Sequence, residues 1–425
     1  MKIAFIYGQF SLGNRPINLL RMRTDKRGLT GSELSCIEFA RGMAARGHDV
    51  ELFLPLSEPE RVIDGVQFRS LRGLLGIDAS YDVAYAWNEP DLLREVGAKF
   101  RMVNQQLNDF VYCRPRFDHF VDCYTSPSQT HLDYVAPLSG SPLKWEVLPN
   151  GCDSTKYRGK KVPGRVVYAS SPDRGLHLLL SVWPKIKEAV PGAHLKVFYE
   201  MGPWLDAFHE QDEIHMQRGE VERGLTETGY RARYVSLALD RLSGLSVTRA
   251  GSVSRDEMAH EMSQAQCLAY PCATIRFTEG FSVSTLEGCA SGAVPVIMPA
   301  DALGQIYAEL PTIATTLEAF TENVIRVLTD PAYAAIATAT GARIADQHQW
   351  TTLTNRLENI IKERTCDKHE SSTAQSTSSS AKSTPTTSTR AGSRSTMKRT
   401  SARGTGASGP GTSSSTSARP TARTR

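Results

Sequence analysis

The hydrophobic pattern at the start of the chain predicts a strand, a helix and a second strand. Residues 2–8, KIAFIYG, form a continuous apolar run that ends in glycine, as expected for a buried parallel strand. Residues 32–47, SELSCIEFARGMAARG, place apolar side chains at positions 34, 37, 40 and 44, which is helical spacing, and Gly47 marks the end. The strand HDVELFLP follows, so this unit predicts a parallel sheet covered by helices.

The same pattern restarts in the second half of the chain. GRVVYAS (164–170) predicts a strand, residues 175–192 a helix with a Pro-Gly stop, and AHLKVFYE a further strand. Ser254 and Glu257 have the spacing of a capping box at the start of another helix. Further elements are expected at CLAYP and AVPVIM (strands) and at 317–329, 331–345 and 350–364 (helices).

Two halves of similar size therefore stand in series, and the predicted fold class is α/β. We expect two Rossmann-like, doubly wound parallel-sheet domains, at 1–150 and 151–345, and a C-terminal helix at 346–365 that packs back on the first domain. Sheets of this kind bind ligands at the carboxyl ends of their strands. Two such domains facing each other make a cleft, which is the expected substrate site.

Residues 366–425 have a different composition. They are mostly Ser, Thr, Arg, Gly, Ala and Pro with almost no large apolar side chain, so we predict a disordered tail. From residue 371 onward there are nine Lys or Arg and no acid; the whole chain carries +4, so the rest carries 4 − 9 = −5. A linker, an artefactual extension and a basic arm that touches anionic lipid or nucleic acid remain open for this tail.

The cysteines and the apolar runs exclude several classes of protein. The eight cysteines contain no CxxC pair, which argues against a zinc ribbon or a disulfide framework and favours a reducing compartment. The N-terminal apolar run is too short for a secretory signal, and no run of about eighteen apolar residues is present to span a membrane. We expect a cytoplasmic protein without specific nucleic-acid binding, and peripheral contact with an anionic membrane stays open.

Two glutamates in residues 278–297, TEGFSVSTLEGCASGAVPVI, carry the candidate chemistry. A helix predicted to start near Phe281 leaves amides around Gly280, Phe281 and Ser282 without intrahelical partners, which makes an anion site. Glu279 lies beside that site and can accept hydrogen bonds from sugar hydroxyls, and Glu287 lies about 12 Å further along the predicted helix axis. This spacing suits a ligand with a sugar, a diphosphate and a ribose in line; an ordinary helix with a capping acid and a surface acid is the alternative.

Four segments together resemble a known family. The stretch EGFSVSTLEGCASGAVPVI resembles the E-x7-E signature of retaining glycosyltransferases of family 4, which have the GT-B fold. LPNGCDSTKY (148–157) is similar to the interdomain motif of that family. Residues 30–53 resemble its first glycine-rich turn and helix, and residues 166–198 resemble its phosphate-loop strand, loop and helix. The matches are in order and span residues 1 to about 362.

The resemblance implies a function and a set of site residues. In that family the N-terminal domain binds the acceptor and the C-terminal domain binds a nucleotide-diphosphate sugar, and transfer retains the anomeric configuration without a metal or a separate cofactor. The resemblance gives catalytic roles to Glu279, Arg174 and Asn108. It implies donor contacts from Gly31, Ser171, Arg174, Gly280, Phe281, Ser282 and Glu287. Glu279 would contact the donor sugar, Glu287 the ribose, and Arg174 the diphosphate in place of the usual lysine.

The chain also departs from the family pattern. The arginine that usually follows the phosphate-loop strand is replaced by Ser170 and Ser171, so phosphate binding would depend on Arg174, Ser170 and Ser171. Where the family often has a histidine, the chain has Gln105-Gln106-Leu107-Asn108-Asp109, so Asn108 or Asp109 would take that contact. Without an evident nucleophile, a front-face reaction is expected, in which the leaving diphosphate helps to deprotonate the acceptor hydroxyl.

The acceptor and several alternatives stay open. Five basic residues in loop 15–27 fit either an anionic acceptor, such as a lipid-linked phosphate, or a solvated loop. A glycan- or nucleotide-binding pseudo-transferase and a nucleotide-sugar 2-epimerase of the same fold are the alternatives to a transferase. A nicotinamide oxidoreductase is disfavoured because no G-x-G-x-x-G follows a strand. The acceptor is expected to be a glycan or a lipid-linked compound.

Overall fold

A computed structural model describes residues 1–8, 16–74, 80–108, 110–207 and 226–380. In the first half these residues form an eight-stranded sheet with the order β3-β4-β2-β1-β5-β6-β7-β8, in which only the β3–β4 pair is antiparallel. Its strands are β1 (Lys2–Tyr7), β2 (Asp49–Leu54), β3 (Arg61–Ile63), β4 (Val66–Ser70), β5 (Ser80–Trp87), β6 (Gly97–Asn104), β7 (Cys123–Ser126) and β8 (Lys144–Val147). The strand order reverses between β1 and β5, the place where such sheets bind ligands.

Alternate residues of the central strand face two different layers. Ile3, Phe5 and Tyr7 belong to a buried cluster with helix α1 (Gly31–Ala45), whereas Ala4 and Ile6 belong to a second cluster that includes Val135 of helix α2 (Gln129–Ser139). All residues of β1 after Lys2 are buried, because the strand is covered on both faces. This accounts for the continuous apolar run at 2–8.

The second half contains a five-stranded, all-parallel sheet with the order β11-β10-β9-β12-β13. Its strands are β9 (Arg165–Tyr168), β10 (His194–Val197), β11 (Val247–Arg249), β12 (Cys267–Tyr270) and β13 (Val294–Ile297). Its helices are α3 (Leu176–Ala189), α5 (Glu227–Arg241), α6 (Arg255–Gln264), α7 (Val283–Ser291), α8 (Leu303–Ile306), α9 (Leu317–Thr329) and α10 (Pro331–Gln347). The order again reverses at the first strand, between β9 and β12.

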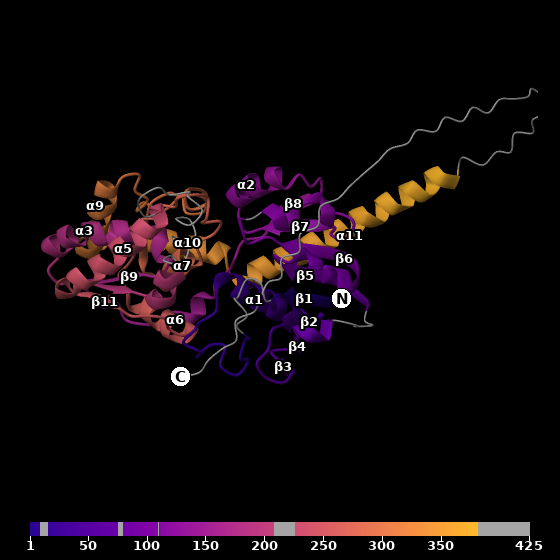
Figure 1. Ribbon diagram of the computed structural model, residues 1–425, viewed down its shortest axis with the longest axis horizontal. Helices are drawn as coiled ribbons and strands as arrows, with labels where there is room; N and C mark the ends of the chain where they lie inside the picture. Colours follow the sequence, from indigo (N-terminus) through magenta and orange to yellow (C-terminus); the bar gives the residue numbers. More distant parts are fainter. Residues whose placement is uncertain (9–15, 75–79, 109, 208–225, 381–425) are drawn as a thin grey trace, which may run out of the picture. The chain divides into compact units, whose positions relative to one another are not determined.

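Helices cover both faces of this second sheet. Val167 and Leu268 pack with Met262 of α6, while the neighbouring Tyr168 and Ala269 join the larger cluster on the other face, which includes α3, α5, α9 and α10. Figure 1 shows α6 on one side of β9 and β11, and α3 and α5 on the other. The predicted fold class, α/β with two doubly wound parallel sheets, is therefore confirmed.

The last helix, α11 (Trp350–Ser380), joins the first half. Leu353, Leu357 and Ile361 lie in the same buried cluster as β1 and α1. Glu358 of α11 is ion-paired with Arg46 next to the end of α1, and hydrogen bonds from Lys362 and then from Arg46 lower the pKa of Glu358 to about 2. These contacts attach the end of the second half to the core of the first.

Helix α11 extends further than the sequence indicated. It continues to Ser380, past residue 366, where we placed the start of the tail because large apolar residues end there. A helix that is already nucleated can add residues without apolar contacts, because each added residue also adds a hydrogen bond. The predicted tail residues 381–425 lie outside the described residues. Among the helices that the structure describes, none is long and apolar enough to cross a membrane.

Candidate active site

A cavity lies between the two halves at the carboxyl ends of their central strands. It encloses about 1020 Å³, part of which is open to solvent. The first half lines it with Gly31, Ser32, Gln106, Leu107, Pro127 and Asn150, and the second half with Ala169, Ser170, Arg174, Arg255, Met258, the segment 278–284 and Glu287. The position agrees with the rule that open α/β sheets bind ligands where the strand order reverses.

Glu279 lies in this cavity and is only 3% exposed. Its Oε2 accepts a hydrogen bond from Nη1 of Arg174 at 2.9 Å and another from the hydroxyl of Tyr270 at 2.5 Å. Among the described residues no hydrogen-bond donor of this kind contacts Oε1, so this oxygen can accept a hydrogen bond from a hydroxyl group of a ligand.

Arg174 is held at the edge of the cavity by the turn that carries it. It ends the short helix η7 (Pro172–Arg174), and its backbone amide donates to Ser171 while its carbonyl accepts from Ala273. Burial opposes the charge of its guanidinium, but the Glu279 carboxylate outweighs that cost and raises the pKa of Arg174. The side chain is 28% exposed, so it is charged and still open to an anion.

Asp301 fixes the backbone on either side of Glu279. Its Oδ2 accepts from the amides of Thr278 at 2.8 Å and Glu279 at 2.9 Å, and from the hydroxyl of Thr274 at 3.0 Å. Asp301 itself has the left-handed φ of 50°, which a short polar residue tolerates better than most. Sequence reasoning missed this residue, although an aspartate in a loop after a buried strand is a recognisable turn signal.

The predicted residue Asn108 contacts the backbone of the Glu279 loop. Its Nδ2 donates to the carbonyl of Thr278 at 2.9 Å, and its Oδ1 is buried without a hydrogen-bond partner. That Oδ1 lies 3.5 Å from the position that a Cβ on Gly280 would take. Asn108 therefore ties the segment after β6 to the loop that carries Glu279, and it is absent from the set of residues that line the cavity. Asp109, the other residue proposed for this contact, lies outside the described residues.

His131 of α2 also reaches this loop, and no local pattern marks it in the sequence. A Cβ on Gly280 would lie 2.6 Å from its Cδ2, so glycine is needed for this approach. Its Nε2 is 3.2 Å from the carbonyl of Leu107 and its Nδ1 is 2.7 Å from the hydroxyl of Ser126. Because a carbonyl only accepts, Nε2 carries the proton of a neutral ring. Burial is the main cause that lowers the pKa of His131 to about 4.

This buried neutral histidine predicts an acid-dependent loss of stability. In the unfolded chain the imidazole binds a proton near pH 6.5, but in the folded chain only near pH 4, so the unfolded state binds more protons between these values. Stability should therefore be fully present above about pH 6.5 and fall by about 3 kcal/mol as the pH drops to 4. Urea unfolding at several pH values measures this loss.

Two glutamine variants test the assignment to His131. Between pH 4 and 6.5 the unfolding free energy of His131→Gln should depend less steeply on pH than that of the wild type. The difference should correspond to one fewer proton taken up on unfolding. The matched variant of the exposed His260 should keep the wild-type slope. An unchanged slope in His131→Gln would show that the imidazole does not titrate as proposed.

The helix after Glu279 starts later than the sequence indicated. Helix α7 begins at Val283, and Ser282 is its N-cap, accepting from the amide of Thr285 at 3.3 Å. The predicted start near Phe281 is wrong because the ring of Phe281 belongs to the core, where it packs near His348. The 12 Å separation inferred for Glu279 and Glu287 is also withdrawn, because the residues before Val283 are not helical.

The N-termini of two helices meet at the cavity. A Cβ on Gly31, the first residue of α1, would lie 2.8 Å from Cγ2 of Val283, the first residue of α7. Gly31, Ser32, Val283 and Ser284 all line the cavity. First-turn amides and the positive ends of two helix dipoles are therefore available to an anion there.

Glu287 also lines the cavity, is 4% exposed and is ion-paired with Arg255 of α6. The hydroxyl of Ser171, proposed from the sequence as a donor contact, instead donates to Asp173, while the neighbouring Ser170 lines the cavity. Gln106 exchanges two hydrogen bonds of 3.0 Å with Asn150, which joins β6 to the segment that leads into the second half.

The basic loop of the first half is partly neutralised. Arg27 pairs with Asp25 at 2.5 Å, and Arg23 pairs with Asp256 of α6 at 2.7 Å. Arg15 lies outside the described residues. In the described part of the chain, His, Cys, Asp and Glu side chains do not gather in groups of three or more that could hold a metal ion.

Comparison with solved structures identifies the architecture. A sucrose-phosphate synthase from Thermosynechococcus elongatus matches with a TM-score of 0.60 and 13% identity, over 85% of this chain and 99% of that chain. Anabaena HepE in complex with UDP and glucose matches with a TM-score of 0.57 and 14% identity, over 85% of this chain and 100% of that chain. AviGT4, a glycosyltransferase of avilamycin A biosynthesis, matches with a TM-score of 0.57 and 13% identity, over 86% and 98%.

No protein-family model matches the sequence, and no curated protein matches it either. The identities to the solved structures are low, so the likeness establishes the fold. The chain has the GT-B fold, with two largely parallel sheets whose strand ends flank the cavity described above.

Proposed function

We propose that this protein is a retaining glycosyltransferase that moves a sugar from a nucleotide-diphosphate donor to a hydroxyl group of an acceptor. The observation that carries the proposal is one cavity with three kinds of group in it. The ion-paired Glu279 and Arg174, the first residues of α1 and α7, and Glu287 all line it. A carboxylate for a sugar, cationic and amide donors for a diphosphate, and a carboxylate for a ribose match the three parts of such a donor.

The residues have distinct roles in this proposal. Oε1 of Glu279 accepts a hydrogen bond from a hydroxyl of the donor sugar. Arg174 binds the diphosphate together with the first-turn amides of α7. The bond between the anomeric carbon and the phosphate oxygen breaks, and the acceptor oxygen bonds to the same face of that carbon. The acceptor's proton passes to the departing phosphate oxygen. Arg174 and the helix ends stabilise the negative charge that develops on the leaving diphosphate, which is where most of the catalysis would arise.

Among the structural neighbours, HepE was solved with UDP and glucose, and AviGT4 is a glycosyltransferase. These neighbours support testing UDP-glucose first and then UDP-, GDP- and ADP-linked sugars as a panel. The acceptor is proposed to be a glycan or a lipid-linked hydroxyl compound that enters from the first half, and no residue of the cavity selects between them.

A donor screen tests the function. Each nucleoside diphosphate is added to the full chain in a thermal-shift assay, and each nucleotide sugar is then incubated with and without hydroxyl acceptors. Release of the nucleoside diphosphate, with a product of retained configuration by NMR, is the expected result. Binding without any turnover would favour the pseudo-transferase, and a sugar inverted at C2 would favour the epimerase. If no nucleotide binds, the proposal is overturned.

A further inference from the structure

Arg255 stands where two cavities meet. Both Arg255 and Glu287 line the cleft described above, and both also line a second cavity of about 620 Å³. This second cavity is formed by α1, the loop before it, residues 151–157, α6 and Trp350. The ion pair between Arg255 and Glu287 therefore forms part of the boundary between the two spaces.

Arg255 is the main cationic partner of a buried acid. The side chain of Glu287 is 6% exposed and that of Arg255 is 22% exposed, and Nη2 of Arg255 donates to Oε1 of Glu287. Burial opposes the charge on Arg255, but the Glu287 carboxylate outweighs it and raises the pKa of Arg255. An arginine that donates to one oxygen of a carboxylate fixes the plane of that carboxylate and leaves its other oxygen to accept elsewhere.

Tyr157 is a second group beside the same acid. Burial and then the neighbouring Glu287 carboxylate raise the pKa of the Tyr157 hydroxyl, so it keeps its proton. A protonated phenol next to a carboxylate is a hydrogen-bond donor towards it. Glu287 therefore has two donors beside it, Arg255 and Tyr157, and it also lines the cleft.

Arg255 occupies a position in α6 that is electrostatically unfavourable for a cation. Arg255 is the first residue of α6, where a positive side chain meets the positive end of the helix dipole. The helix start is nevertheless held firmly. Ser254 and Glu257 form a capping box, with bonds of 3.2 and 2.9 Å.

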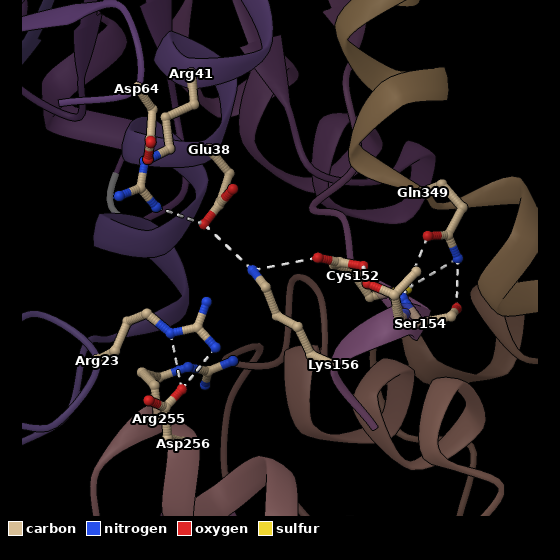
Figure 2. A network of polar contacts seen from close by, with 12 residues as sticks. Arg23, Glu38, Arg41, Asp64, Cys152, Ser154, Lys156, Arg255, Asp256 and Gln349 are labelled. Atoms are coloured by element: carbon tan, nitrogen blue, oxygen red, sulfur yellow. Dashed lines mark hydrogen bonds and ion pairs between the residues drawn. The ribbon is translucent and has the colours of Figure 1, made fainter. Parts of the chain in front are cut away.

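The same turn is also attached to the first half. Figure 2 shows Arg23 reaching the carboxylate of Asp256, next to Arg255, while Lys156 reaches Glu38 nearby. The amide of Asp256 donates to the carbonyl of Arg23 at 3.1 Å. The backbone that carries Arg255 is thus fixed from both halves, which limits where its guanidinium can lie.

We propose that Arg255 is a positioning residue for ribose recognition: it holds Oε1 of Glu287 so that Oε2 is turned to accept hydrogen bonds from the two vicinal hydroxyls of the donor's ribose. This inference rests on the proposed function and adds to it a selectivity for a ribose over a sugar without the two hydroxyls. Affinity should depend on the ribose hydroxyls through Arg255, although Arg255 itself would touch only Glu287.

A comparison of two ligands on the wild type and on an Arg255 variant tests this proposal. The nucleoside diphosphate that stabilises the wild-type chain most is compared with its 2′,3′-dideoxy analogue by calorimetric titration. The wild type should bind the ribose form about 10- to 100-fold more tightly, the range of one or two charge-assisted hydrogen bonds. In Arg255→Gln this preference should nearly vanish, because the ribose form weakens while the dideoxy form keeps its affinity.

Further variants keep the test decisive. Arg255→Lys retains a charge without the planar fork, so it should restore part of the preference and serves if the glutamine variant does not fold. Arg343→Gln removes an exposed ion pair with Glu309 elsewhere in the second half and should change neither affinity. Equal weakening of both ligands, or an unchanged preference, would overturn the role of Arg255. If the wild type binds no nucleoside diphosphate, the proposed function itself fails.

Discussion

Replacing Arg174 by glutamine is expected to lower kcat/KM for the donor by about 10²- to 10³-fold, equivalent to about 3–4 kcal/mol of transition-state stabilisation. Arg174 is the cation closest to Glu279, at 2.9 Å between Nη1 and Oε2, and it lines the cavity. In the reaction proposed here, negative charge grows on the leaving diphosphate, and a fixed guanidinium stabilises that charge more than it stabilises the ground state. Glutamine is similar in reach but neutral, so it removes that stabilisation.

The measurement is steady-state kinetics with saturating acceptor and the donor found in the screen. Arg174→Lys should lose less activity than Arg174→Gln, because it keeps a charge but not the bidentate fork. Arg343→Gln, which removes an exposed pair with Glu309, is the matched control and should retain full activity. Activity of Arg174→Gln within a few-fold of the wild type would show that the leaving group is stabilised elsewhere.

Replacing Gly175 by alanine is expected to destabilise the second half by more than about 4 kcal/mol. Gly175 has a φ of +133°, and an added Cβ would lie 2.1 Å from the carbonyl oxygen of Pro271. Both partners in that clash are backbone, so no side-chain rotation can relieve it. The residue also joins Arg174 to α3, so the variant should lose donor binding at temperatures where it stays folded.

Thermal and urea unfolding measure this effect. At roughly 2–4 °C per kcal/mol for a domain of 150–250 residues, the expected fall in Tm is about 10 °C. Gly192→Ala is the matched control, because nothing lies within 4 Å of its Cβ position and its φ is not left-handed; its change should stay within about 0.5 kcal/mol. A Gly175→Ala variant as stable as Gly192→Ala would contradict the geometry of this turn.

The parts of the fold that the sequence predicted are those set by local patterns. The apolar run at 2–8 became β1 because a strand covered on both faces needs apolar side chains at every position. The capping box of Ser254 and Glu257 is present as predicted, because its two bonds involve residues only three apart. Likewise, Gly47 follows the end of α1 and has the left-handed φ of 83°.

The site was harder to predict, because its contacts join distant segments. Asn108 bonds to Thr278, 170 residues away in sequence, and His131 packs against Gly280, about 150 residues away. No local pattern marks such a partner. The start of α7 was misplaced for a similar reason: Phe281 is drawn into the core, and this delays the helix to Ser282 and Val283.

The resemblance to a family supplied Glu279, Glu287 and Arg174, and all three line one cavity. It could not supply Arg255 or Asp301. Their roles depend on which side chains this particular chain places beside the two acids. Motifs locate the groups that face a ligand, whereas the residues that orient them are visible only in the packed structure.

The central claim is that Glu279 and Glu287 contact opposite ends of one donor, and calorimetric titration of Glu279→Gln and Glu287→Gln tests it most directly. Each variant is titrated with a nucleoside diphosphate and with the corresponding nucleotide sugar. Glu279→Gln should weaken binding of the nucleotide sugar by about tenfold, the value of one charge-assisted hydrogen bond, and leave the sugar-free nucleotide unchanged. Glu287→Gln should weaken both ligands equally. If Glu279→Gln weakens both ligands alike, or neither variant changes either affinity, the two acids do not divide the donor between them.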